Sequence, residues 1–213
     1  MKFAREGYFV AAVPALAAVL SWAIWGPAAA AIPALLAVGV LLFFRDPERT
    51  SEGDDASVIA PADGKVVAVE DLPVGHLLAD EAKHRIAIFM SPLNVHVNRS
   101  PVSAEVDAVK HRRGSFRAAY SAEASDVNES NAILLNSSDG FRLVVVQIAG
   151  WMARRIVCRV HRGSRLLRGE RLGLIMFGSR VDVYLPEQVR ATVVPGDRVR
   201  AGASVIAQVK VSR

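Results

Sequence analysis

The stretch from Tyr8 to Phe44 contains no charged residue, whereas the rest of the chain has the mixed composition of a globular domain. This stretch divides at Trp25-Gly26-Pro27 into two segments, each close to the roughly 17 to 20 residues that cross a bilayer core as a helix. Tryptophan at the break and phenylalanine at the far end suit the membrane interface. The sequence therefore predicts a helical hairpin within a membrane over residues 1–45.

Basic residues flank both ends of this apolar stretch. Lys2 and Arg5 precede it, and Arg45 and Arg49 follow it. Because cytoplasmic flanks are enriched in lysine and arginine, we expect both ends on the cytoplasmic face of the cell membrane. Two alternatives stay open. One is a shallow re-entrant hairpin, since both segments are short and contain proline. The other is a secretory signal peptide, although a second apolar segment directly after the cleavage site argues against it.

The rest of the chain is rich in arginine, and the formal net charge is +5. Such a surface could attract nucleic acid. Beside a membrane segment, anionic lipid headgroups are the simpler partner, so a membrane and no nucleic acid is expected. The single cysteine, Cys158, excludes an internal disulfide and a cysteine-built zinc site. Four of the five histidines show no ligand spacing, and no metal is expected.

Residues 46–57 form a polar linker in this interpretation, and residues 58–213 form a β domain. Short runs of alternating apolar and polar residues are separated by Gly, Asp and Asn, which is typical of antiparallel sheets. Residues 59–70 and 191–211 share the strand-turn-strand pattern of biotinyl and lipoyl carrier domains. We predict a mainly β fold, a barrel-like or sandwich domain whose carrier-like halves come from the two ends of the globular part.

The segment "GLIMFGSRVDVYLP", residues 173–186, predicts a buried strand whose apolar run is interrupted by Gly178-Ser179. A glycine inside such a pattern often marks a bulge or a close backbone approach. Taken alone, the Gly-Ser pair is weak evidence for chemistry.

Several motifs together resemble the phosphatidylserine decarboxylases, particularly their short bacterial and archaeal branch. They are "FFRDPER", "PADGKV", "SPLNVHVNRSP", "QIAGWMARRIV", "RGERLGLIMFGSRVDVYLP" and "GDRVRAGASVIA". The resemblance implies decarboxylation of phosphatidylserine to phosphatidylethanolamine. An archaetidylserine-type ether lipid is an alternative substrate. An alternative of another class is a non-catalytic, membrane-tethered carrier-like scaffold, for which Lys65 is the candidate lysine although it lacks the flanking methionines usual at such sites.

The resemblance also implies self-cleavage between Gly178 and Ser179. Ser179 Oγ would attack the Gly178 carbonyl to form an ester, and β-elimination and hydrolysis would leave a pyruvoyl group as the cofactor. The small chain, 179–213, would then form a heterodimer with the large chain, 1–178. The pyruvoyl ketone forms a Schiff base with the substrate amine in this family. Glycine suits the cleaved bond because attack requires strained backbone without a side chain in the way.

The family pairs its serine with an aspartate and a histidine. Asp63 matches the aspartate; without the resemblance, a turn-forming role before Gly64 would be favoured. His96 matches the first of two histidines spaced three apart, and Arg99 occupies the second position. We expect His96 to donate a proton after decarboxylation, the alternative being a satisfied interior histidine. The base for self-cleavage is left open between His96 and Asp63 acting with water.

Two further pairs lie near these motifs. Arg180 and Asp182 could orient the chain, contact the phosphate or carboxylate of the substrate, or form a plain cross-strand pair. Asn128-Glu129 matches an element of the family whose role the sequence does not reveal.

Overall fold

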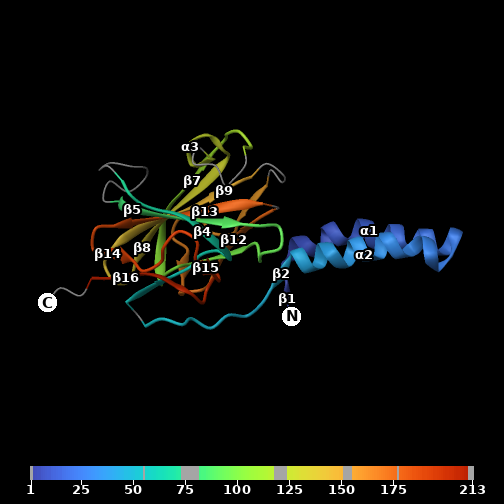
Figure 1. The fold of residues 1–213 in the computed structure, drawn as a ribbon, viewed down its shortest axis with the longest axis horizontal. Helices are drawn as coiled ribbons and strands as arrows, with labels where there is room; N and C mark the ends of the chain where they lie inside the picture. The colour runs from blue at the N-terminus through green and yellow to red at the C-terminus, as the bar shows by residue number, and fades with distance from the viewer. Residues whose placement is uncertain are drawn as a thin grey trace. The chain divides into compact units, whose positions relative to one another are not determined.

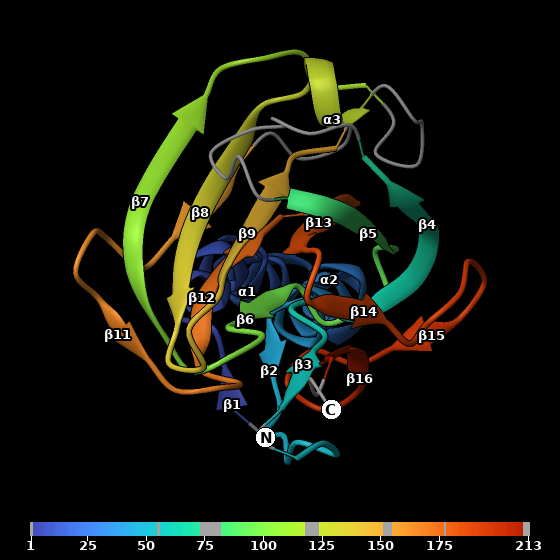
Figure 2. The same cartoon turned by 90° about the vertical axis from the view of Figure 1, so that its left-hand side faces the viewer.

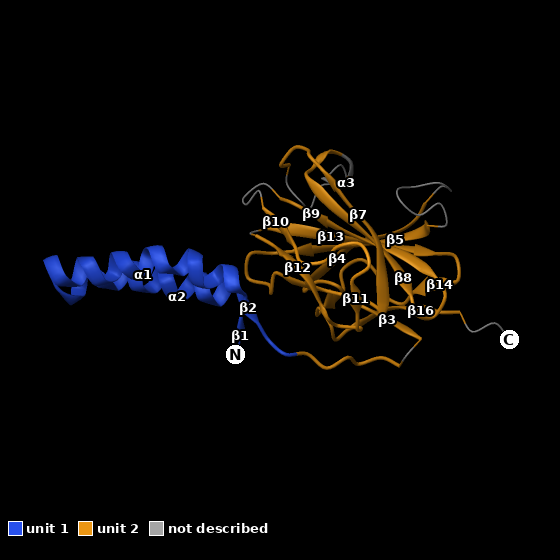
Figure 3. Ribbon diagram, turned by 180° about the vertical axis from the view of Figure 1, so that it is seen from behind, with its two compact units in different colours: residues 1–48 blue, residues 49–213 orange. Residues whose placement is uncertain are grey.

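The computed structural model describes residues 2–54, 56–72, 82–117, 124–150, 155–176 and 178–210 (Figure 1). The chain divides into two compact units, residues 1–48 and 49–213, which are coloured separately in Figure 3. Unit 1 is helical and unit 2 is built from strands. The mainly β fold with an N-terminal helical hairpin is therefore confirmed.

Unit 1 is a helical hairpin closed by a short sheet. Helices α1 (Arg5–Trp25) and α2 (Pro27–Phe43) lie side by side in Figure 1. Gly26 joins them with a φ of +86°, a left-handed conformation that glycine adopts without a Cβ penalty. At the open end, β1 (Lys2–Phe3) pairs antiparallel with β2 (Arg45–Asp46).

The helices of unit 1 carry an apolar surface. Large apolar side chains point outward, among them Phe9, 77% exposed, and Leu35, 71% exposed. A helix that is apolar on all sides is typical of a membrane segment or a buried core. With 21 residues, α1 is long and apolar enough to cross a membrane, whereas α2 is a shorter apolar helix. Unit 1 therefore has the composition expected of a membrane-associated segment.

Unit 2 contains one large sheet and two small ones, all with antiparallel pairing. The eight-stranded sheet has the order β11-β7-β8-β9-β13-β5-β4-β15, and the small sheets have the orders β10-β12-β6 and β14-β16-β3. The elements in chain order are β3 (Ser57–Ile59), β4 (Gly64–Asp71), β5 (Ala82–Met90), β6 (Val97–Arg99), β7 (Ala104–Arg112), α3 (Ala124–Val127), β8 (Ser130–Ser137), β9 (Arg142–Ile148), β10 (Ile156–Cys158), β11 (Arg165–Leu166), β12 (Arg171–Ile175), β13 (Ser179–Pro186), β14 (Val189–Ala191), β15 (Arg198–Val199) and β16 (Val205–Val209).

The large sheet curves around the main apolar core, as Figure 2 shows. Alternate residues of β5, β8, β9 and β13 enter this core, and residues from β3, β12, β14 and β16 cover it from the other side. The sheets are not closed into a barrel. The domain is therefore an open, sandwich-like version of the predicted barrel or sandwich.

Strands from the two ends of the globular part pair with one another. β15 pairs with β4, and β16 pairs with β3. This pairing agrees with the prediction that the carrier-like halves come from both ends of unit 2.

Candidate active site

Gly178 lies between two strands rather than inside one. β12 ends at Ile175 in a three-stranded sheet, and β13 begins at Ser179 in the eight-stranded sheet. The prediction of a single interrupted strand over residues 173–186 is therefore wrong. Gly178 has a φ of +63°, and a Cβ built on it would meet no atom within 4 Å. The need for glycine is thus conformational, because this backbone region is unfavourable for L side chains.

Ser179 opens the central strand β13 and is fully buried. Its Oγ donates a hydrogen bond of 3.4 Å to Met90 Sδ, and Met90 is its cross-strand partner on β5. A thioether sulfur is a weak acceptor, so this bond costs little to replace. The serine hydroxyl accordingly lies at the margin of the apolar core, directly after a left-handed glycine.

A chain of buried amides continues from Met90, and the sequence analysis missed it. Asn98 Nδ2 lies 3.7 Å from Met90 Sδ, and Asn98 Oδ1 accepts a 2.8 Å hydrogen bond from Gln147 Nε2. Asn131 Nδ2 donates in turn to Gln147 Oε1 at 3.1 Å. The available signal was Gln147, one polar residue within the apolar run of β9. Buried amides that bond one another fix the positions of the strands that carry them.

His96 precedes β6 and is 2% exposed. Its Nδ1 lies 2.9 Å from the carbonyl oxygen of Asn94. Because a carbonyl can only accept, Nδ1 carries the hydrogen, and the neutral ring then has its lone pair on the buried Nε2. The backbone amide of Ile175 donates to the His96 carbonyl at 3.3 Å, so the histidine is tied to the end of β12 from which the Gly178 junction departs.

Asp63 lies at the same end of the sheet, with β5 between it and Ser179. Arg49 NH2 donates to its Oδ2 at 3.0 Å, and the amide of Ala201 donates to its Oδ1 at 2.7 Å. Lys65 pairs with Phe89 and Ser179 with Met90, so the Asp63 and Ser179 backbones are about two strand spacings, roughly 10 Å, apart. The structure therefore does not bring Asp63 into hydrogen-bond contact with Ser179.

Arg99, at the second histidine position, faces the same turn as Asp63. Its NH1 donates to the carbonyl of Gly169 at 2.9 Å, and its Cδ would lie 2.7 Å from a Cβ built on Gly202. Asp63 binds the neighbouring Ala201 amide. Asp63 thus binds the turn after β15, and the Arg99 side chain packs beside the same turn at Gly202.

Arg180 and Asp182 bind each other on the face of β13 opposite to Ser179. Arg180 Nε donates to Asp182 Oδ1 at 2.6 Å and its NH2 to Oδ2 at 3.1 Å. Ser125 Oγ donates to Asp182 Oδ2 at 2.7 Å. The pair lies within one strand, two residues apart, so the cross-strand version of the prediction is corrected. Both side chains are buried on the far side of the sheet from the Ser179 hydroxyl.

Two other groups join this charged network. Arg85 NH1 lies 4.0 Å from Asp182 Oδ2. Burial lowers the pKa of Arg85, but Asp182 and the Tyr184 hydroxyl outweigh this effect, so the net shift is upward. Burial and the Asp182 carboxylate raise the pKa of Tyr184 to about 12 against the opposing effect of Arg85. At neutral pH Arg85 is therefore charged and the Tyr184 hydroxyl keeps its proton.

Asn128 has a structural role. Its Nδ2 donates to the carbonyls of Arg117 and Ala149 at 2.8 and 2.9 Å, and its Oδ1 accepts from the Arg117 amide. Glu129 Oε1 lies 3.1 Å from His111 Nε2. The Asn-Glu element thus ties the start of β8 to neighbouring backbone.

This arrangement defines a class of protein: a β domain in which a buried serine follows a left-handed glycine between two sheets, with an imidazole on the adjoining segment. The family model of phosphatidylserine decarboxylase matches residues 36–207. A phosphatidylserine decarboxylase proenzyme of Magnetococcus marinus is 42% identical over 208 residues, which cover 97% of this chain and 95% of the relative. A proenzyme of the same name from Desulfotalea psychrophila is 43% identical over 169 residues, covering 79% and 78%. The chain belongs to the phosphatidylserine decarboxylase family, as the resemblance predicted.

Proposed function

We propose that this protein cleaves itself between Gly178 and Ser179 and then decarboxylates phosphatidylserine to phosphatidylethanolamine. The main support is 42% identity, over 97% of the chain, to a relative named phosphatidylserine decarboxylase proenzyme. The buried serine after a left-handed glycine supports the proposal independently.

In the cleavage step, Ser179 Oγ loses its proton and attacks the Gly178 carbonyl carbon. The peptide C–N bond breaks, an ester forms, and the Ser179 nitrogen takes up a proton. Loss of the Ser179 α-proton then breaks the C–O bond and releases Gly178 as a carboxylate. Water replaces the remaining nitrogen as ammonia and leaves the ketone of a pyruvoyl group. The left-handed φ of Gly178 is a conformation that glycine adopts at no steric cost, and the residue has no side chain beside the carbonyl that is attacked.

A pyruvoyl group fits the space of residue 179. A pyruvoyl group has no hydroxyl to donate, and the acceptor of the Ser179 hydroxyl here is the Met90 sulfur, a weak acceptor. Once formed, such a group supplies an electrophilic carbonyl that accepts the substrate amine and the electrons released with CO₂. Residue 179 is fully buried beside the apolar core, so its surroundings have low polarity.

His96 is the proton donor in this proposal, and Asp63 supports processing. The Nδ1 bond to Asn94 orients the imidazole, so Nε2 is the nitrogen that would donate the proton. Asp63 holds the turn after β15 through the Ala201 amide, so it acts on processing by positioning the sheet end.

The two chains produced by cleavage would remain together as a heterodimer. β13 is paired with β5 on one side and β9 on the other, and β15 and β16 pair with β4 and β3. These ladders join residues 179–213 to residues 1–178 without the cleaved bond. The small chain therefore has no route to leave without unfolding the sheet.

The apolar hairpin would hold the enzyme on a membrane that contains its phospholipid substrate. Basic residues at both ends favour the cytoplasmic face. The carrier-like scaffold is less well supported, because Lys65 lies within strand β4, paired with Arg198 and Phe89, rather than at a hairpin tip.

Intact-mass spectrometry of the detergent-purified protein, together with release of CO₂ from phosphatidylserine, tests the proposal. We expect two chains of residues 1–178 and 179–213, the smaller with the mass of an N-terminal pyruvoyl group, and phosphatidylethanolamine as product. A single uncleaved chain without decarboxylation would refute the proposal. An archaetidylserine sample in parallel tests the ether-lipid alternative.

A further inference from the structure

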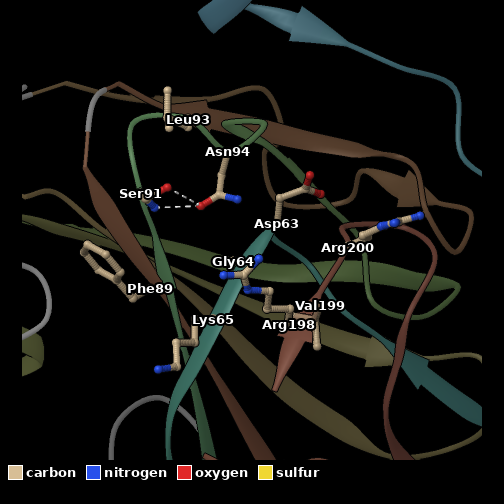
Figure 4. Close-up of a pocket in the computed structure, with 10 residues that line it drawn as sticks. All are labelled: Asp63, Gly64, Lys65, Phe89, Ser91, Leu93, Asn94, Arg198, Val199 and Arg200. Atoms are coloured by element: carbon tan, nitrogen blue, oxygen red, sulfur yellow. Dashed lines mark hydrogen bonds between the residues drawn. The ribbon is translucent and has the colours of Figure 1, made fainter. Parts of the chain in front are cut away.

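The Met90 side chain lies on the face of β5 that is turned towards Ser179. Met90 is fully buried, pairs with Ser179 across the two strands, and accepts the Ser179 hydroxyl at 3.4 Å through its sulfur. Phe89, one residue earlier, lies on the other face of the sheet, where it lines a cavity of about 640 Å³ (Figure 4). The acceptor of the reacting hydroxyl is therefore a thioether inside the core.

The weakness of this acceptor suits a hydroxyl that must react. A buried hydroxyl without a partner is unfavourable, so Ser179 needs an acceptor inside the core. A carbonyl or carboxylate oxygen would meet this need, but it would also hold the proton strongly. A thioether sulfur is a weak acceptor, so it directs the Oγ–H bond and still allows the proton to leave.

The same sulfur suits the side chain that cleavage would leave behind. In the proposed reaction the Cβ–Oγ bond of Ser179 breaks, and Oγ departs as part of the Gly178 carboxylate. The Ser179 Cβ takes up a proton and becomes a methyl group, so an apolar group then faces Met90. An amide at position 90 would lose its partner at this step and remain buried and unsatisfied. A thioether can accept the hydroxyl before cleavage and pack against the methyl group after it.

The Met90 sulfur needs further support, because a methionine side chain has three rotatable bonds. Asn98 Nδ2 donates to Met90 Sδ at 3.7 Å, and Asn98 Oδ1 accepts from Gln147 Nε2 at 2.8 Å. Gln147 Oε1 accepts from Asn131 Nδ2 at 3.1 Å. All three amides are buried. They form a directed chain from β8 through β9 and β6 that ends on the sulfur.

The backbone that follows Met90 is also held. The amide and the hydroxyl of Ser91 both bind Asn94 Oδ1 at 2.8 Å, as the dashed lines in Figure 4 show. The Asn94 carbonyl in turn accepts from His96 Nδ1 at 2.9 Å. The end of β5 and the amide chain therefore locate the sulfur from two directions.

We infer that Met90 is a positioning residue for self-cleavage, and that Asn98 acts through it by holding the sulfur against the Ser179 hydroxyl. The inference rests on the proposed function, because it needs the cleavage step. It predicts a division of effects. Loss of the sulfur slows cleavage, whereas each cleaved molecule keeps its turnover, because the methyl group requires only an apolar neighbour.

The first test compares Met90→Leu with the matched control Ile88→Leu. Both positions are fully buried on the same face of β5, and both substitutions nearly conserve volume, but only the first removes a sulfur. Each chain is made in a cell-free reaction with detergent, and denaturing gels follow cleavage over time. We expect cleavage of Met90→Leu to be about tenfold slower than that of the wild type, because the nucleophile is no longer oriented. Ile88→Leu should cleave at the wild-type rate.

The second measurement distinguishes positioning from a distorted sheet. After cleavage is complete, CO₂ release is measured per small chain of pyruvoyl mass. We expect kcat and KM of Met90→Leu to match those of the wild type. A fall in kcat in proportion to the fall in cleavage rate would show a general distortion and overturn the inference. Equal cleavage rates in Met90→Leu and Ile88→Leu would also overturn it, while leaving the proposed function intact. A wild-type chain that stays uncleaved would instead refute the proposed function, and the inference with it.

A double-mutant cycle tests the role of Asn98. Asn98→Leu alone should slow cleavage less than Met90→Leu does, and the double variant should be no slower than Met90→Leu, because Asn98 acts through the sulfur. Multiplied effects in the double variant would overturn this route. Thermal unfolding in the Ser179→Ala background, where no variant cleaves, checks that each chain folds. The Met90→Leu comparison decides the inference even if Asn98→Leu fails to fold.

Discussion

Strand β13 is buried on both faces, and the two faces are chemically opposite. Ser179 and Val181 face the apolar core, whereas Arg180, Asp182 and Tyr184 face a network of charges. Apolar contacts are non-directional, so they contribute stability but specify register weakly. Charge-assisted hydrogen bonds require defined geometry. The charged face therefore fixes the register of the strand whose other face presents the serine.

A register slip illustrates the difference between the faces. Because side chains alternate, a shift of one residue would place Arg180 and Asp182 in the apolar core and move Ser179 out of it. Burying an ionised pair without its partners is strongly unfavourable. The position of the reacting serine thus depends on residues whose side chains lie on the other face of the strand.

The largest expected effect follows from removing the hydroxyl on the apolar face. Ser179→Ala removes the only group that the mechanism uses to attack Gly178, so we expect no cleavage at all and a folded chain of full length. Ser130→Ala, a buried serine on β8 of the same sheet, serves as the control and should cleave normally. Denaturing gels and intact mass measure both. Two fragments from Ser179→Ala would contradict the assigned nucleophile.

The next largest effects distinguish self-cleavage from decarboxylation. His96→Ala should cleave normally but lose about 10²- to 10⁴-fold in the rate of CO₂ release, because a positioned proton donor typically contributes this much. Asp63→Ala should slow cleavage, because it frees Arg49 and the Ala201 amide. Gels follow cleavage, and CO₂ release follows turnover. If His96→Ala blocks cleavage while Asp63→Ala cleaves normally, His96 is the processing base and the assigned roles are reversed.

Features set by local pattern were predictable from the sequence. The uncharged stretch from Tyr8 to Phe44 predicted the hairpin, and alternating runs predicted the antiparallel strands. The shared pattern of residues 59–70 and 191–211 also predicted that two halves of the domain come from the two ends of the globular part, whose strands pair in the structure. In each case a property of neighbouring residues determines the structure, so one sequence suffices.

Features set by contacts between distant segments were not predictable. The apolar run around Gly178 resembles one strand, but its two halves join different sheets, and Gly178 has a positive φ at the junction. The bond from Asn98 to Met90 and the bond from Asp63 to Ala201 depend on which strands meet. The alternation of apolar and polar residues cannot reveal such partners. It shows which face of the sheet a side chain occupies, but not which strand lies beside it.

The contributions of the two faces of β13 to the free energy of unfolding can be compared with one substitution on each face. Asp182→Ala leaves Arg180 buried without its bidentate partner, so we expect the free energy of unfolding to fall by about 3 to 5 kcal/mol. Val181→Ala removes two methyl groups from the apolar face and should cost about 2 kcal/mol. Denaturant unfolding in detergent measures both variants. A smaller loss for Asp182→Ala than for Val181→Ala would show that the charged face does not specify the strand.

The last effect concerns the titration of Tyr184 on the charged face. Its pKa is raised to about 12 in the folded protein, against 10.0 for an unperturbed tyrosine. Between these pH values the unfolded chain releases a proton that the folded chain retains. The stabilising contribution is therefore complete below pH 10.0 and is lost as pH rises towards 12, a change of about 2 to 3 kcal/mol. Tyrosinate absorbance should show a late step that Tyr184→Phe removes and Tyr8→Phe retains. A late step that persists in Tyr184→Phe would mean that burial and the Asp182 carboxylate do not act on this hydroxyl as the geometry requires.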